Sequence, residues 1–156
     1  LTQAAGRAGR GEVPGEVVIQ TYQPEHYSIK TAKDQDYEAF YRQEIEYRKM
    51  MLYPPVFHLL VILCASKWEQ RASDGADELL HEIDGIQELK KKIFPIGPAD
   101  PAIARINDIY RKVIYLKAED YQNLVFVKDR LEKFVRDNTD YKDIVVQFDF
   151  NPVNGF

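Results

Sequence analysis

Two consecutive prolines, Pro54 and Pro55, restrict the folding of this chain more than any other feature of its sequence. No helix runs through two prolines, and the first of them biases the residue before it, Tyr53, towards extended geometry. Apolar side chains at helical spacing precede the prolines over residues 34–52, whereas an apolar run typical of a buried strand follows at 57–64. We therefore place the main boundary here and expect two domains, 1–55 and 56–156.

The second of these domains shows an alternation of strand and helix patterns. The predicted elements are, in order, a strand at 57–64, a helix at 67–92, an extended run at 93–97, a strand at 108–117, a helix at 119–136 and a strand at 143–150. Gly75 and Gly85 weaken the first helix and mark places where it can break. This order is that of a ferredoxin-like βαββαβ sandwich, a four-stranded sheet with both helices on one face. The predicted fold class is α+β.

The first domain has fewer regular patterns. Residues 15–21 predict a short buried strand after the Pro14-Gly15 turn, and Pro24 can open a helical turn over 25–31. A longer helix is predicted over 34–52, with acidic residues at its start, where the helix dipole favours them. The first domain is therefore expected to be rich in helix.

Composition narrows the class of protein. Cys64 is the one cysteine, so an internal disulfide is impossible, and the three histidines lack metal-ligand spacing; no metal site is expected. The longest apolar stretch, 56–65, is too short to cross a bilayer, and no secretion signal precedes it. A cytoplasmic protein is the expectation. Because the chain opens at Leu1 directly into a charged glycine motif, we expect a piece of a longer protein.

That opening motif reads Gln3-Ala4-Ala5-Gly6-Arg7-Ala8-Gly9-Arg10. Two arginines three residues apart on a helical turn share one face, and the intervening glycines allow a ligand to approach closely. Forked guanidinium donors suit phosphate oxygens. Taken alone, the short pattern G-R-x-G-R is more typical of a basic loop with turn glycines.

A second candidate site comes from the charge distribution. The net charge is -4, but residues 86–117 carry seven basic and three acidic side chains. Basic and aromatic side chains of this region could contact the sugar-phosphate backbone of DNA, which would position the DNA without reading its sequence. The candidate residues are Lys90, Lys91, Lys92, Tyr110, Arg111 and Lys112. The alternative is that the tyrosine packs in the sheet and that the three consecutive lysines favour a helix C-terminus. Both interpretations remain open.

The full opening string resembles motif VI of the superfamily 2 helicases, Q-x-x-G-R-x-G-R. Further segments extend the resemblance along the chain: QAAGRAGRGEVPGEVVIQTYQPEHYSI, DYEAFYRQEIEYRKMMLYPP, GPADPA and FDFNPVNGF. Together they resemble the C-terminal end of the primosomal replication-restart DNA helicases, the PriA (primosomal protein N′) family. One departure is Asp100, where the family's turn would have proline; this affects the rigidity of the turn rather than the chemistry.

The resemblance implies an ATP-dependent 3′-to-5′ DNA helicase that recognises stalled forks and D-loops and reloads the replisome. It implies that Arg7 and Arg10 contact the γ-phosphate, with Arg10 as the arginine finger, and that Gln3, Gly6 and Gly9 belong to the nucleotide side. Residues 1–55 would end the second RecA-like lobe. Residues 56–156 would form an S10-like domain that binds fork DNA near the docking site of single-stranded DNA-binding protein.

The sequence also lacks motifs that an ATP-dependent helicase needs. It contains neither a G-x-x-x-x-G-K-[ST] phosphate loop nor an acidic pair in a magnesium-binding setting. ATP and Mg²⁺ are therefore expected only in the full-length protein. The resemblance also implies a cysteine-rich zinc insertion, which is expected in an upstream region because Cys64 is the one cysteine here. The fragment is predicted to bind DNA, single-stranded DNA-binding protein or other primosome proteins, not a membrane, and not to hydrolyse ATP alone.

Two other classes remain as alternatives. One is a stand-alone, non-catalytic ferredoxin-like module that binds nucleic acid or protein and whose arginine motif is accidental. The other is a small phosphate-handling enzyme that uses Arg7 and Arg10 by itself.

Overall fold

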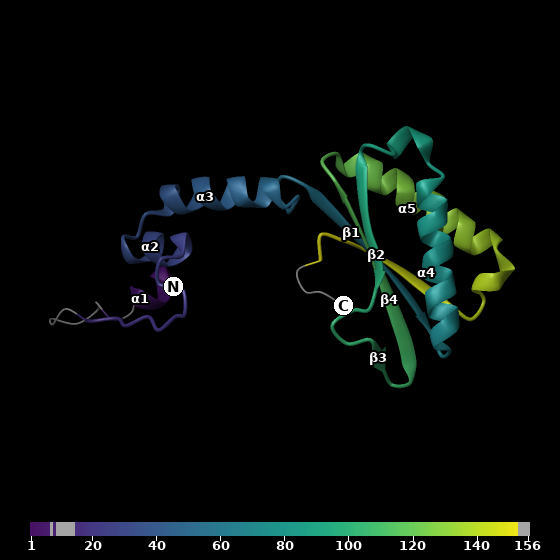
Figure 1. Ribbon diagram of the computed structural model, residues 1–156, viewed down its shortest axis with the longest axis horizontal. Helices are drawn as coiled ribbons and strands as arrows, with labels where there is room; N and C mark the ends of the chain where they lie inside the picture. The colour runs from purple at the N-terminus through teal and green to yellow at the C-terminus, as the bar shows by residue number, and fades with distance from the viewer. Residues whose placement is uncertain (7, 9–14, 153–156) are drawn as a thin grey trace. The chain divides into compact units, whose positions relative to one another are not determined.

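The computed structural model describes residues 1–6, 8 and 15–152, and the chain divides into two compact units, 1–48 and 49–156. Figure 1 shows the elements of both units and labels the five α-helices and the strands β1 to β4. Arg7, Gly9 and Arg10, which the sequence analysis assigned to the nucleotide, lie outside the described residues.

The first unit is built from helices: α1 (Thr2–Ala5), α2 (Tyr27–Lys33) and α3 (Tyr37–Met50), whose last two residues fall in the second unit. α2 begins after His26, whose Nδ1 accepts a hydrogen bond from the backbone N–H of Ser28 at 3.3 Å. Asp36 caps α3 in the same way, since its Oδ1 accepts from the N–H of Ala39 at 2.9 Å. The helices predicted at 25–31 and 34–52 are therefore confirmed with shorter or shifted bounds.

The strand predicted at 15–21 is wrong. These residues follow no regular secondary structure, and the side chains of Val17 and Val18 are 45% and 85% exposed. A strand needs the N–H and C=O groups of a neighbouring strand, and the described part of residues 1–48 contains no strand that could pair with residues 15–21. The apolar run alone was therefore not enough to make a strand.

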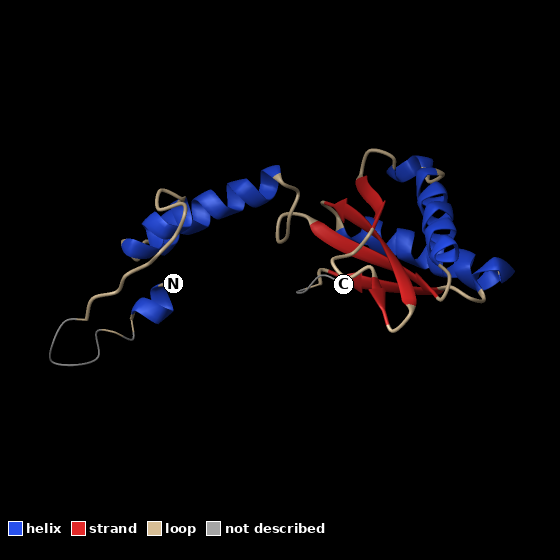
Figure 2. Cartoon of the chain, turned by 60° about the horizontal axis from the view of Figure 1, so that its bottom comes forward, coloured by secondary structure: helices blue, strands red, loops and turns tan. Residues whose placement is uncertain are grey.

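The second unit is an α+β domain. Its strands are β1 (His58–Ser66), β2 (Ile93–Ala99), the short β3 (Arg105–Ile106), β4 (Ile109–Ala118) and β5 (Val145–Phe150). Its helices are α4 (Glu69–Asp84) and α5 (Tyr121–Asp137), followed by the 3₁₀ turns η1 (Gln87–Leu89) and η2 (Thr139–Tyr141), respectively. The four longer strands pair antiparallel in the order β2-β4-β1-β5, and β3 pairs with β4. Figure 2 shows both helices on the same side of this sheet.

The predicted α+β class and the predicted order of the six main elements of this unit are confirmed. The extent of the first helix is wrong, because α4 ends at Asp84 with Gly85 as its C-cap, and the chain then passes through η1 into β2. Gly75 does not break the helix. It lies inside α4, where a Cβ would come within 2.7 Å of Ile144 Cδ1, so glycine provides close packing here. β3 was not predicted.

The core lies between the sheet and the two helices. Alternate residues of β1, Leu60, Ile62 and Cys64, face this core and are fully buried, and their neighbours Val61 and Leu63 join a smaller buried cluster that includes Val113 of β4. Burial raises the pKa of the Cys64 thiol to about 12. At neutral pH this thiol is therefore protonated, and it contributes to core packing rather than acting as a nucleophile.

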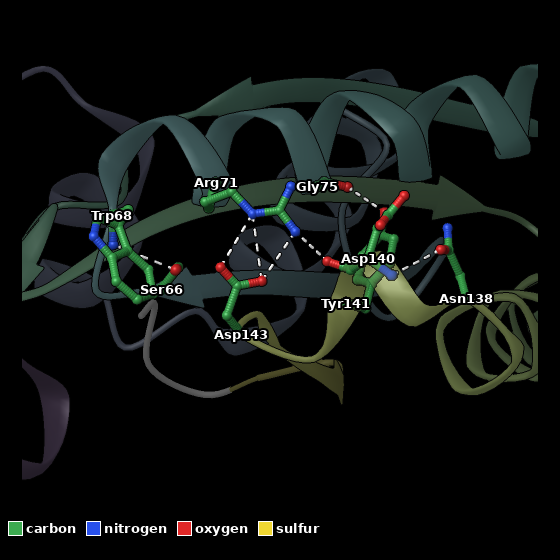
Figure 3. Close-up of polar contacts among 8 residues, drawn as sticks. All are labelled: Ser66, Trp68, Arg71, Gly75, Asn138, Asp140, Tyr141 and Asp143. Carbon is green, nitrogen blue, oxygen red and sulfur yellow. Dashed lines mark hydrogen bonds and ion pairs between the residues drawn. The ribbon is translucent and has the colours of Figure 1, made fainter.

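Polar contacts tie α4 to the segment that leads into β5 (Figure 3). Arg71 Nη2 lies 2.9 Å from Asp143 Oδ1, and the same guanidinium donates to the backbone carbonyl of Asp140. Gly75 lies one turn after Arg71 on α4, and its backbone carbonyl accepts a hydrogen bond from the buried Tyr141 hydroxyl at 2.8 Å. The hydrogen bonds from Arg71 hold the pKa of the Asp143 carboxyl below its usual range. Each of these groups has a partner within the fold, so the cluster is structural.

Candidate nucleic-acid interface

The three consecutive lysines lie in the turn between η1 and β2. Lys90, Lys91 and Lys92 are all exposed, and none of them forms an ion pair with another residue that the structure describes. They follow the C-terminus of the 3₁₀ turn η1, whose C-cap is Lys90, rather than the C-terminus of the long helix predicted at 67–92. Their charges are therefore available to an anion from outside.

The second predicted cluster, Tyr110 to Lys112, has a different environment. The Arg105 guanidinium lies 4.7 Å from the centre of the Tyr110 ring, and Lys112 Nζ lies 2.6 Å from Asp100 Oδ1. Arg111 Nη1 donates to the carbonyl of Ile103 at 3.2 Å. These contacts hold the loop of residues 100–108 against β4, so the cluster has a structural role. Asp100, the departure from the family pattern, supplies one of the ion pairs.

The strand register separates the two groups. Ile93, which follows the lysines, pairs with Ala118 at one end of β4, whereas Arg105 pairs with Tyr110 near the other end. These two positions are eight residues apart along β4, which at a rise of roughly 3.3 Å per residue corresponds to about 26 Å. The six candidate residues therefore do not form one patch.

A groove of about 420 Å³ lies beside two of the lysines. Its lining comes from the starts of β1, β2 and α5 and consists of Phe57, Lys91, Lys92, Phe94, Glu119, Asp120 and Asn123. The two phenylalanine rings meet edge to face, with 6.3 Å between their centres. We call this feature the β2–α5 groove. It combines lysines that form no ion pair with another described residue and an exposed aromatic ring.

The sequence analysis missed the aromatic and amide members of this groove. Phe57 and Phe94 are 37 residues apart in the chain and are brought together by the pairing of β1 and β2 with β4. Local periodicity carries no signal for such a contact. The local signs were that Phe57 lies two residues after Pro55 and Phe94 two residues after Lys92.

Lys117 lies next to the groove but serves the fold. It pairs with Phe94 across the sheet and is only 9% exposed. Its ammonium group donates to the carbonyl of Met51 at 3.0 Å and lies 4.1 Å from the centre of the Tyr53 ring. Burial lowers the pKa of this lysine. These contacts attach residues 51–53 to the sheet, so the segment before the two prolines belongs to the second unit.

The residues that were predicted to contact the nucleotide belong to the first unit. Gln3 lines a pocket of about 570 Å³ together with residues of α2 and α3, while Gly6 caps α1. Asp36 is the one charged side chain in the lining, and no lysine or arginine of the described residues reaches it. Such a lining does not fit a polyphosphate. The residues that line this pocket therefore do not by themselves form an ATP site.

Within 1–6, 8 and 15–152, no three histidine, cysteine or acidic side chains come together as a set that would hold a metal ion. None of the helices in this part of the chain has the length and apolarity required to span a membrane.

The second unit is therefore an α+β domain with an aromatic and basic groove at one end of its sheet. Residues 49–153 match the family described as the primosomal protein N C-terminal domain, and the chain belongs to that family. The resemblance inferred from the motifs is thereby confirmed.

Relatives with established names extend the similarity to nearly the whole chain. The replication restart protein PriA of Bacillus subtilis (strain 168) is 37% identical over 153 residues, which are 97% of this chain and 19% of that protein. PriA of Synechocystis sp. is 34% identical over 94% of this chain and 17% of its own length, and PriA of Borreliella burgdorferi is 30% identical over 99% and 23%. The chain thus spans about a fifth of the length of these relatives.

Proposed function

We propose that this chain is the C-terminal part of an ATP-dependent 3′-to-5′ DNA helicase that restarts stalled replication forks by binding forks and D-loops and reloading the replisome. The observation that carries the proposal is the similarity to replication restart proteins over 97% of the chain, which includes the segment with the paired arginines as well as the α+β domain.

Within such a protein the two regions would have different tasks. Residues 1–55 would end the second RecA-like lobe, with Arg7 and Arg10 contacting the γ-phosphate and Gln3, Gly6 and Gly9 beside them. Residues 56–156 would form a ferredoxin-like, S10-like domain that binds DNA and partner proteins. The strand order β2-β4-β1-β5 with both helices on one face supports the ferredoxin-like assignment.

The chain by itself would bind rather than unwind. Phosphoryl transfer needs a phosphate cradle, a metal ion and an arginine finger together, and the sequence supplies candidates for the finger alone. ATP, Mg²⁺ and zinc would belong to the remainder of the full-length protein. Its partners would be fork DNA, single-stranded DNA-binding protein and other primosome proteins, in the cytoplasm.

Two measurements test this proposal. The purified chain should bind a labelled fork in a fluorescence anisotropy titration while showing no DNA-stimulated ATP turnover. In the full-length protein, Arg10→Ala should lower ATP turnover by roughly 10³- to 10⁵-fold without weakening fork binding. ATP turnover by residues 1–156 that Arg10→Ala abolishes would show instead a small phosphate-handling enzyme. Fork binding absent from the isolated chain would contradict the DNA-binding assignment of 56–156.

A further inference from the structure

We propose that the β2–α5 groove holds one unpaired nucleotide of single-stranded DNA, with its base against Phe94 and its flanking phosphates on Lys91 and Lys92. This inference rests on the proposed function, because it assigns a binding site to the DNA that the domain is proposed to contact. It goes further by naming the residues and the single-stranded form of the ligand.

The aromatic wall is the first part of the argument. Phe94 remains 42% exposed although the residues that follow it across the sheet, Lys117 and then Leu59, are buried or half-buried. The Phe57 ring packs against it in an edge-to-face arrangement, which restricts the position of the Phe94 ring. A base that stacks on such a platform gains apolar contact whatever its identity. The groove volume of about 420 Å³ lies in the range of roughly 300–1,000 Å³ found for small-ligand pockets.

The cations give the second part. Lys91 and Lys92 line the groove, are exposed, and have no ion-pair partner among the described residues. Lysine ammonium groups on flexible stems adapt to phosphate groups along a backbone. An aromatic platform beside unpaired lysines is the combination by which proteins bind single strands without reading their sequence.

The acidic side chains of the opposite wall belong to α5. Asp120 is the N-cap of this helix, and its Oδ1 accepts a hydrogen bond from the N–H of Gln122 at 2.9 Å. The positive end of the helix dipole offsets the charge of Asp120 and of Glu119 before it. The Asn123 amide, which lies one turn into the helix, offers one donor group and one acceptor to the edge of a base. This wall therefore suits a base rather than a phosphate.

The same geometry favours an unpaired nucleotide over a duplex. In a duplex both faces of each base are covered by its stacked neighbours, so Phe94 would meet only sugar and phosphate. An unpaired base can place its face on the ring while its own phosphate reaches the lysines next to it. An acidic peptide with an apolar side chain is the competing occupant, and the test separates the two.

The test uses the whole chain and a short fluorescein-labelled oligothymidylate. Phe94→Ala should weaken binding by roughly 5- to 150-fold, the range found when one stacked base loses its aromatic partner, and Phe94→Tyr should restore it. Lys91→Gln with Lys92→Gln should lower the slope of log affinity against log salt by about 1.4, since two phosphate contacts are lost. Trp68→Ala is the matched control, because Trp68 is 59% exposed and lies beyond the opposite end of β1. Lys133→Gln with Lys142→Gln is the control for charge.

The outcomes separate the groove from the proposed function. If the wild-type chain binds forks but Phe94→Ala and the double lysine variant bind single strands unchanged, the groove proposal is wrong and the domain binds DNA elsewhere. If the wild-type chain binds neither fork nor single strand, both proposals fall. A labelled acidic peptide that binds the wild type, is lost in Phe94→Ala and is not displaced by oligothymidylate would assign the groove to a protein partner and overturn the inference. Thermal unfolding of each variant checks that it is folded.

Discussion

The two units of this chain differ in what supports their helices. In the described part of residues 1–48, Thr31 is the one buried residue, and aromatic side chains of α3 such as Tyr37 and Tyr41 are 73% and 53% exposed. In the second unit the helices cover a sheet whose central strand, β1, has no exposed residue. Good helix patterns therefore occur in both units, but among the described residues only the second unit has a core. Amphipathic spacing is therefore enough to specify a helix, whereas burial of the helix also requires an apolar surface against which it can pack.

In the first unit, polar contacts rather than a buried apolar core hold α2 and α3 together. The Glu44 carboxylate accepts hydrogen bonds from the Tyr27 hydroxyl of α2 and from Arg48 Nε, the latter at 2.6 Å. These bonds lower the pKa of Glu44 and raise that of Tyr27. Because they lie near the surface, they stabilise less than a buried apolar contact does. We expect the first unit to open at lower free energy than the second.

Amide hydrogen exchange should show the largest contrast between the units. The amides of residues 60–65 lie in a strand that pairs on both sides, with β4 and with β5, whereas residues 15–20 have no regular secondary structure. Exchange at 60–65 should require global opening, at roughly 5–15 kcal/mol, and exchange at 15–20 should need almost none. Equal or reversed protection, read by mass spectrometry, would contradict the comparison.

Truncation of apolar side chains should give the next largest difference. Leu116 is fully buried between the sheet and its helices, so Leu116→Ala should cost about 2–5 kcal/mol. Ile45 on α3 is only half-buried, and Ile45→Ala should leave the second unit unaffected. Trp68 is the one tryptophan and belongs to the second unit, so its fluorescence in urea reports on that unit alone. A shift of this transition by Ile45→Ala would show that the two units unfold together.

The extent to which the sequence predicts this fold follows the same division. Periodicities of two and 3.6 residues, with Pro and Gly as boundaries, were enough to predict the order of elements in residues 56–156. The apolar run at 15–21 was misleading because a strand also needs a partner, which local pattern does not reveal. The register of β2 on β4 lies beyond local pattern too, and it is this register that separates Lys91 from Lys112 and brings Phe94 to Phe57. The residue types of the candidate interface were thus predictable, but their grouping was not.

A smaller effect concerns the place where the two regions join. The Lys117 ammonium holds the Met51 carbonyl and the Tyr53 ring against β4, which attaches the segment before the prolines to the second unit. Tyr53→Ala should therefore lower the stability of this unit by about 0.5–2 kcal/mol and speed amide exchange at 50–53. Tyr53→Phe keeps the ring face and should behave as the wild type. If Tyr53→Ala changes neither measurement, the boundary lies after the prolines and not before them.

The smallest effect should come from the ion pair between α4 and the segment before β5. Because Arg71 holds the pKa of Asp143 below its ordinary value of 3.8, the folded state binds the proton less readily than the unfolded state does. The stabilisation is therefore fully present above the unfolded pKa and is lost as the pH falls through the folded one. Asp143→Asn should be less stable than the wild type at neutral pH, and the gap in urea midpoint should close below about pH 4. The matched control is Asp149→Asn on β5, whose carboxylate is exposed and forms no ion pair with another described residue. If the difference in urea midpoint between the wild type and Asp143→Asn stays constant from neutral to acid pH, packing rather than the charge of Asp143 stabilises the contact between α4 and this segment.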